Sequence, residues 1–142
     1  MIDLRIKDIR EDADLTQNEC AKILKTTQGN YSRWENKIEL IPLKKLNMLC
    51  NYFSINMDYV IGMSPKKKVT KSYILTNEII GNNLKKLRKE KNLTQEDLAE
   101  SLHTSQSTIS AYESGKNTLL TAFALEIVEK YNISLDWLCG RK

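Results

Sequence analysis

Apolar residues recur along the chain at helical spacing. Near the start, Ile2, Ile6 and Ile9 lie three or four positions apart, which places them on one face of a helix. No stretch alternates apolar and polar residues as a half-buried strand does. The pattern therefore predicts an all-α protein built from short helices.

Helix-starting and helix-ending residues divide the first 63 residues into five such helices. Thr16 and Glu19 have the spacing of a capping box, in which a hydroxyl and an acid satisfy free backbone donors. The Thr26-Thr27 pair restarts the chain into a third helix, and Pro42 suits the first turn of a fourth. Gly62 is a suitable C-terminal cap for a fifth.

The same pattern occurs twice, 78 positions apart. Leu15-Thr16-Gln17 aligns with Leu93-Thr94-Gln95, and the match runs without a gap from about residue 5 to residue 63. Such a repeat indicates a tandem duplication. We predict one five-helix domain over residues 1–63, a linker over 64–76, and a second domain over 77–142.

The net charge of +4 is confined to the predicted linker. Each predicted domain contains as many acidic as basic residues, so the excess is Lys66, Lys67, Lys68 and Lys71. Ser64-Pro65 interrupts helix formation and the lysines repel one another, which favours an extended tether. A tether of this length reaches at most about 43 Å. That exceeds one turn of duplex DNA, about 34 Å.

The composition is that of a globular protein, with 41% hydrophobic and 28% charged residues. No apolar run approaches the roughly 18 residues that a membrane span requires. The N-terminus carries a charge at every second or third position, unlike a signal peptide. We expect a cytoplasmic protein without a membrane partner.

The cysteines and the single histidine do not suggest a metal or catalytic site. Each cysteine aligns with an apolar residue of the other copy: Cys20 with Leu98, Cys50 with Val128 and Cys139 with Ile61. They are expected to be small buried hydrophobic residues, and His103 is expected to be exposed. The sequence contains no Gly-rich phosphate loop and no Ser/His/Asp arrangement. We expect no enzyme, cofactor, metal or small-molecule ligand.

Within each copy, the second and third helices are short and separated by a turn of small residues, as in a helix-turn-helix, whose second helix enters the major groove of DNA. The stretches LTQNECAKILKTTQGNYSRWENK and LTQEDLAESLHTSQSTISAYESGK, followed by INMDYVIG and ISLDWLCG, resemble the Cro/cI-type (Xre-like) family of phage and bacterial repressors. The resemblance implies two lambda-repressor-like domains in a sequence-specific DNA-binding transcriptional regulator, a repressor. Double-stranded DNA is the expected partner, and a homodimer remains open.

The resemblance also implies which side chains contact DNA. Glutamine suits adenine and arginine suits guanine, because each can form two hydrogen bonds with the base edge. The predicted base contacts are Gln28, Gly29 and Arg33 in the first copy and Gln106, Ser107 and Ala111 in the second. The predicted contacts to the DNA backbone are Gln17, Thr27, Asn30, Asn36, Lys37, Lys44, Lys45, Gln95, Ser105, Thr108, Lys66, Lys67 and Lys68.

The remaining features of the third helix are interpreted as structural. Tyr31 and Trp34 align with apolar or aromatic residues of the second copy, which favours core positions over a stacking platform for bases. The turn that follows has Asn36-Lys37 where the second copy has Ser114-Gly115, so Lys37 is expected to adopt a strained backbone or to reshape the turn.

Two identical charge pairs occur in the repeat, Arg10 with Glu35 and Arg88 with Glu113. In related repressors such a pair resembles a buried ion pair joining the first and third helices. We predict the same structural role here.

Two alternative interpretations remain. Ala111 has no hydrogen-bonding group for a base, whereas Arg33 has several. The second copy could therefore serve for dimerisation or partner binding, with Leu119 and Leu120 as an exposed surface. The chain could also be an antitoxin or anti-regulator whose main target is a protein.

Overall fold

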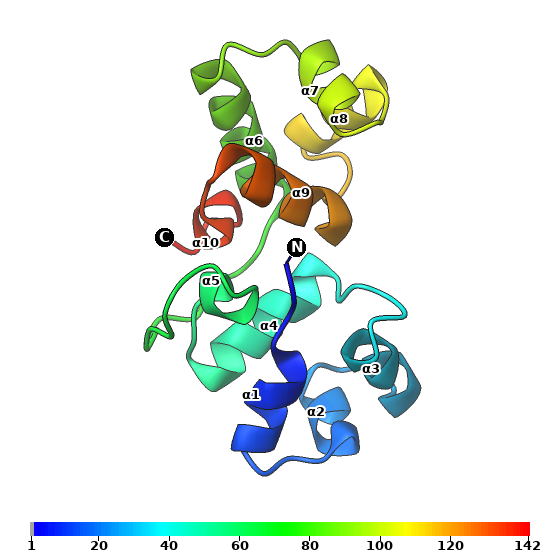
Figure 1. Cartoon of the computed structure of the whole chain (residues 1–142), viewed down its shortest axis with the longest axis vertical. Helices are drawn as coiled ribbons and strands as arrows, with labels where there is room; N and C mark the ends of the chain where they lie inside the picture. The colour runs from blue at the N-terminus through cyan, green and yellow to red at the C-terminus, as the bar shows by residue number, and fades with distance from the viewer. Residues whose placement is uncertain (1) are drawn as a thin grey trace. The chain divides into compact units, whose positions relative to one another are not determined.

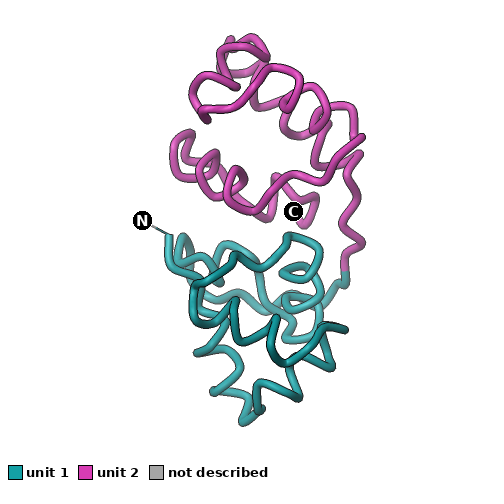
Figure 2. Tube along the Cα trace, turned by 90° about the vertical axis from the view of Figure 1, so that its right-hand side faces the viewer, with its two compact units in different colours: residues 1–72 teal, residues 73–142 magenta. Residues whose placement is uncertain are grey.

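The computed structural model describes residues 2–142, and within them the chain is helical with no β-strand (Figure 1). Met1, with which the first predicted domain begins, lies outside the described residues. The chain divides into two compact units, with the boundary between Ser72 and Tyr73 (Figure 2). The prediction of an all-α fold is confirmed, and none of the described helices is long and apolar enough to cross a membrane.

Within residues 2–142, each unit contains five helices. Unit 1 comprises α1 (Ile6–Asp12), α2 (Gln17–Ile23), α3 (Gln28–Glu35), α4 (Leu43–Phe53) and α5 (Met57–Val60). Unit 2 comprises α6 (Asn77–Glu90), α7 (Gln95–Ser101), α8 (Gln106–Glu113), α9 (Thr121–Tyr131) and α10 (Leu135–Leu138). The boundaries of domains and linker derived from the repeat stay predictions.

Side-chain caps fix where the helices begin. The Thr16 hydroxyl accepts the Glu19 N–H at 3.1 Å while the Glu19 carboxylate accepts the Thr16 N–H at 3.0 Å, so the predicted capping box of α2 is confirmed. In α7, Thr94 and Asp97 form the same two bonds at 3.0 and 2.9 Å. Each such cap contributes about 1 kcal/mol. Gly62, with φ of 77°, follows the end of α5 as predicted.

The apolar stripes of the helices meet inside each unit. In unit 1, Tyr31 is fully buried and Trp34 is 8% exposed, with their rings edge to face at 6.1 Å. In unit 2, Ile109 and Tyr112 take the same positions and are also buried. The prediction that these are core positions is confirmed. All three cysteines are buried and free, as predicted, and His103 is exposed.

The first helices of the two units differ in length. In unit 2, α6 begins at Asn77 and its Gly81 packs directly on the backbone of α8. A Cβ atom at Gly81 would contact the Tyr112 carbonyl oxygen and lie 2.7 Å from that of Glu113. The counterpart of Gly81 in unit 1 is Asp3, which carries a side chain, and α1 begins only at Ile6. The extra turns of α6 therefore depend on a residue without a Cβ atom.

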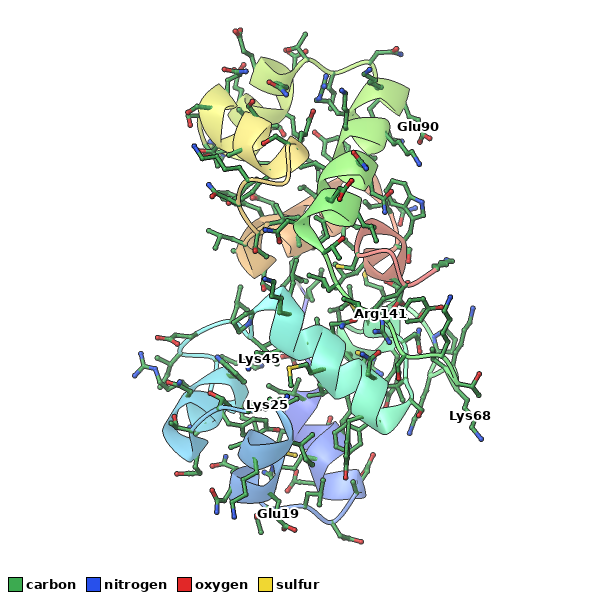
Figure 3. All side chains as sticks on the ribbon, turned by 180° about the vertical axis from the view of Figure 1, so that it is seen from behind. Glu19, Lys25, Lys45, Lys68, Glu90 and Arg141 are labelled. Atoms are coloured by element: carbon green, nitrogen blue, oxygen red, sulfur yellow. The ribbon has the colours of Figure 1, made fainter. Side chains whose placement is uncertain are left out.

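The chain after α5 returns to unit 1 as an extended strap, residues 64–69. The Val69 N–H donates to the Ser54 carbonyl at 2.9 Å. The Lys67 N–H donates to the Asn56 side-chain oxygen, also at 2.9 Å. Backbone hydrogen bonds thus hold the first half of the predicted linker on unit 1, while its lysine side chains remain exposed, as Lys68 illustrates in Figure 3.

Lys37 has a φ of 61°, where the Cβ atom of an L-residue crowds the following carbonyl oxygen. The corresponding residue of unit 2 is Gly115, with φ of 80°. Replacing Lys37 with glycine is expected to raise the free energy of unfolding of unit 1 by about 0.5–1 kcal/mol, measured by urea denaturation. The exposed ion pair of Lys37 with Asp3 is too solvated to offset this gain. The matched exchange, Gly115→Lys, should destabilise unit 2, and a destabilised Lys37→Gly protein would contradict the argument.

Candidate nucleic-acid interface

The predicted base-contacting residues lie on α3 and α8. Gln28, Gly29 and Arg33 are exposed on α3. Gln106 and Ser107 are exposed at the start of α8, whereas Ala111 is half-buried in its middle. The Thr27 hydroxyl caps the N-terminus of α3, and the Ser105 hydroxyl caps that of α8. The first residue after each cap is an exposed glutamine, Gln28 in α3 and Gln106 in α8.

A chain of hydrogen bonds leads from the interior of unit 1 to this surface. The Arg10 guanidinium donates to both oxygens of Glu35, at 2.7 and 3.0 Å, and to the Leu15 carbonyl at 2.8 Å. The Gln17 amide then donates to Glu35 at 3.1 Å, and Gln28 donates to the Gln17 oxygen at 2.9 Å. The buried Arg10–Glu35 pair therefore positions an exposed side chain at the start of α3.

Unit 2 repeats this network bond for bond. Arg88 donates to Glu113 at 2.7 and 3.0 Å. Gln95 donates to Glu113 at 3.2 Å, and Gln106 donates to Gln95 at 2.6 Å. The predicted ion pairs between first and third helices are confirmed in both units, and their carboxylates are only 1% and 4% exposed.

The Glu35 carboxylate determines the orientation of the side-chain amides of Gln17 and Gln28. Glu35 can only accept hydrogen bonds, so Gln17 must direct its NH₂ group inward and its oxygen toward Gln28. Gln28 consequently donates one N–H to Gln17 and keeps its oxygen and a second N–H. An acceptor beside a donor is the pattern that adenine N6 and N7 require. The network thus leaves the oxygen and one N–H of the Gln28 side chain available at the surface of α3.

The same contacts keep the Glu35 side chain ionised. Burial on its own would raise the pKa of Glu35, but the hydrogen bonds from Arg10 and Gln17 and the charge of Arg10 bring the pKa below its ordinary value. Hydrogen bonding to Glu35 correspondingly raises the pKa of Arg10. Both groups are charged at neutral pH.

Arg33 has a partner that its position in the sequence does not predict. Its guanidinium pairs with Glu39 at 2.9 Å, because the backbone N–H groups of Ile38 and Glu39 both bond to the Arg33 carbonyl and fold the loop back over α3. Both side chains are about half exposed, so the pair contributes at most about 1 kcal/mol and can open for another acceptor. In unit 2 the counterparts are Ala111 and Asn117, which cannot form such a pair.

The predicted backbone-contacting residues are distributed over helix starts, turns and the strap. Lys45 already has partners: its ammonium donates to the carbonyls of Leu24 at 2.8 Å and Lys25 at 3.3 Å, at the end of α2 (Figure 3). Gln17, Gln95 and Thr108 are half-buried within the networks and caps. The exposed members are Thr27, Asn30, Asn36, Lys37, Lys44, Ser105, Lys66, Lys67 and Lys68.

One expectation about the second copy is wrong. Leu119 is not exposed beside Leu120: it is 2% exposed, whereas Leu120 is 58% exposed. Leu119 aligns with Ile41, which is 1% exposed, so the side chain occupies the core position before the fourth helix of each unit. The expected apolar surface is therefore reduced to one residue.

Comparison with known families finds one helix-turn-helix domain in each unit. Residues 6–60 match a family described as "Helix-turn-helix", and residues 81–141 match one described as "Helix-turn-helix domain". The chain therefore contains two helix-turn-helix domains in tandem. Both are helix-turn-helix domains of the Cro/cI (Xre-like) type, as the resemblance of the sequence implied.

The chain is also similar to a curated protein with a different description. The chain is 29% identical over 79 residues to "Antitoxin PezA" of Streptococcus pneumoniae serotype 4. The match covers 56% of this chain and 50% of the relative, so the chain spans about half the length of the curated relative it matches.

Proposed function

We propose that the protein is a sequence-specific DNA-binding transcriptional regulator, a repressor, in which α3 and α8 each enter a major groove of double-stranded DNA. The observation that carries the proposal is the network from Arg10 to Gln28 and its duplicate from Arg88 to Gln106. Each network ends in an exposed amide oriented for an adenine edge. Packing of the second helix against the third does not require the last bond of each network, which joins two glutamine side chains at the surface.

The two domains are proposed to prefer different half-sites. Arg33 can form two hydrogen bonds with guanine, whereas Ala111 can contact only a thymine methyl group. Ser107 also replaces Gly29 and adds a hydroxyl. Joining both domains in one chain makes the second contact intramolecular, so two modest affinities combine into a strong one.

The Arg33→Ala substitution is expected to weaken binding to a selected site by about 1–3 kcal/mol and to relax the preference at one base pair. The measurement is the affinity for the selected duplex and for its variants at each position. Arg33→Lys is the matched control, because lysine keeps the charge but lacks the two-pronged donor. Unchanged base preference in Arg33→Ala would contradict a base contact.

Changing Lys66, Lys67, Lys68 and Lys71 to glutamine is expected to reduce the slope of log K against log salt by up to about 0.9 for each lysine that contacts a phosphate. The affinity is measured over a range of salt concentrations. The control has four exposed lysines in or just after α6, Lys85, Lys86, Lys89 and Lys91, changed in the same way. Equal slopes in the wild-type protein and in the protein with these four substitutions would show that these lysines do not contact phosphates.

The proposal is tested by selecting bound duplexes from a random pool with the complete chain and two variants. One variant carries Gln28→Ala and Arg33→Ala, and the other carries Gln106→Ala and Ser107→Ala. If both domains bind DNA, the wild type enriches two unlike half-sites and each variant loses one of them. If only the first variant loses binding, the second domain does not read DNA.

A second candidate function is supported by the relative named an antitoxin. On this proposal the first domain binds DNA while another part of the chain binds a protein partner. It predicts a stable complex with the product of a neighbouring gene that forms without DNA. Purifying the two proteins together after nuclease treatment tests this, and separate elution of the two would contradict it.

A further inference from the structure

The loop between α3 and α4 (Figure 1) carries an acid onto the face that is proposed to approach DNA. The backbone N–H groups of Ile38 and Glu39 donate to the Arg33 carbonyl at 3.0 and 3.3 Å. The Glu39 carboxylate accepts a hydrogen bond from Nη2 of Arg33 at 2.9 Å. Because backbone hydrogen bonds tie residue 39 to residue 33, the carboxylate is held within reach of the guanidinium.

Unit 2 has a loop of the same length at this place but neither of the two charges. The Asn117 N–H donates to the Ala111 carbonyl at 3.2 Å, the counterpart of the bond from Glu39 to the Arg33 carbonyl. The side chains at the two positions are a methyl group and an amide, which form no ion pair. The backbone bond therefore does not require the pair, and the acid occurs only in the copy that has an arginine beside it.

The contact restrains Arg33 without using up its donors. A guanidinium carries five N–H groups in a fixed planar fork, and the bond to Glu39 engages one on Nη2. The remaining N–H groups are sufficient for the two hydrogen bonds that guanine O6 and N7 accept. The Glu39 side chain is itself 53% exposed, so its charge repels any phosphate that approaches this end of α3.

In the proposed complex, two kinds of acceptor compete for Arg33. Phosphate oxygens occur along every sequence and carry no sequence information, whereas guanine O6 and N7 occur only at particular positions. Contacts to phosphates account for most of non-specific binding. An unrestrained arginine side chain can reach either kind of acceptor because its stem has many rotamers. A neighbour that limits these rotamers therefore changes specificity as well as affinity.

We propose that Glu39 is a specificity-determining residue that acts by positioning Arg33, an inference that rests on the proposed entry of α3 into the major groove. A contact between Arg33 and a phosphate requires the ion pair to open and leaves the Glu39 carboxylate unpaired beside a second negative charge. A contact with guanine uses the remaining N–H groups and keeps the pair intact. Glu39 therefore weakens binding to every duplex by its charge, but weakens binding to unrelated duplexes more.

The test compares the complete wild-type chain with Glu39→Gln on the selected duplex and on an unrelated duplex of the same length. Glutamine keeps the size and an oxygen acceptor but removes the charge. The ratio of the two affinities is expected to fall by about three- to fivefold, the limit that an exposed ion pair sets. The matched control is Glu11→Gln, which removes an exposed charge from α1 and should leave the ratio unchanged. An equal gain of Glu39→Gln on both duplexes would overturn the proposal.

The same substitution in an Arg33→Ala background separates positioning from general charge. Without the guanidinium, Glu39→Gln should leave the ratio of affinities unchanged, because the acid has nothing to position. A fall in the ratio that persists without Arg33 would overturn the proposal. Both side chains are about half exposed, so neither substitution is expected to unfold unit 1.

The outcomes also separate this inference from the proposed function. A wild-type chain that binds all duplexes alike would refute both. A base preference that Arg33→Ala relaxes and Glu39→Gln leaves intact would refute only the positioning role of Glu39. A preference that both substitutions relax, at the same base pair and without additivity, is the result expected if Glu39 acts through Arg33.

Discussion

The Glu35→Ala substitution is expected to unfold unit 1, lowering its free energy of unfolding by about 3–5 kcal/mol. The Glu35 side chain is 1% exposed and accepts three hydrogen bonds, two from Arg10 and one from Gln17. Alanine leaves the Arg10 guanidinium charged, mostly buried and without its carboxylate. A small domain has only about 5–15 kcal/mol of stability in total, so the loss is a large part of it.

The two tryptophans allow this loss to be assigned to one unit. Trp34 lies in unit 1 and Trp137 in unit 2, so their indole NMR signals report the units separately during denaturation. Glu113→Ala is the matched control, and it should destabilise unit 2 alone. Replacing both charges, Arg10→Met with Glu35→Leu, should restore much of the stability. A Glu35→Ala protein whose Trp34 signal melts as in the wild type would show that the pair does not hold unit 1 together.

The Gly81→Ala substitution is expected to destabilise unit 2 by about 3 kcal/mol. Its new Cβ atom would lie within 3 Å of the carbonyl oxygens of Tyr112 and Glu113, and these are backbone atoms that cannot rotate away. Relief requires that α6 and α8 separate, which also disturbs the Glu113 carboxylate and its network. The measurement is the denaturation midpoint followed at Trp137.

Gly29→Ala provides the matched control for Gly81→Ala. Gly29 also lies in a helix, but a Cβ atom there meets nothing within 4 Å. Alanine at Gly29 should therefore stabilise unit 1 by about 0.5–1 kcal/mol, the ordinary gain over glycine in a helix. Equal effects at the two positions would show that packing against α8 is not the reason for glycine at position 81.

The fold is predictable from the sequence because its signals are local and occur twice. Apolar spacing, the capping box at Thr16 and the core aromatics each depend on residues a few positions apart, and alignment of the copies identifies the buried cysteines. The expectation for Leu119 fails because hydrophobicity alone does not say which way an irregular segment turns its side chain. Comparison with Ile41, its counterpart, could have corrected this.

The parts of the candidate site that the sequence does not predict depend on contacts between distant segments. The Gln17–Glu35 bond joins residues 18 positions apart, and only the recurrence of both residues in the second copy could have suggested it. The pairing of Arg33 with Glu39 depends on the fold of a loop for which spacing gives no rule. The lysines and Ser64-Pro65 predict an extended tether, but not that its first half is held on unit 1 as the strap. The N–H groups that hold the strap belong to every residue type except proline, so no residue type signals them.

The tandem duplication affects how the sequences of the two domains can evolve. In a symmetric dimer of a single domain, one codon determines the same residue in both recognition helices, so any change alters both halves at once. Here α3 and α8 are encoded separately, and Arg33 and Ala111 already differ. Under the proposed function, each helix can acquire substitutions while the other stays constant, so a new base preference can arise in one half of the site without loss of the old one in the other.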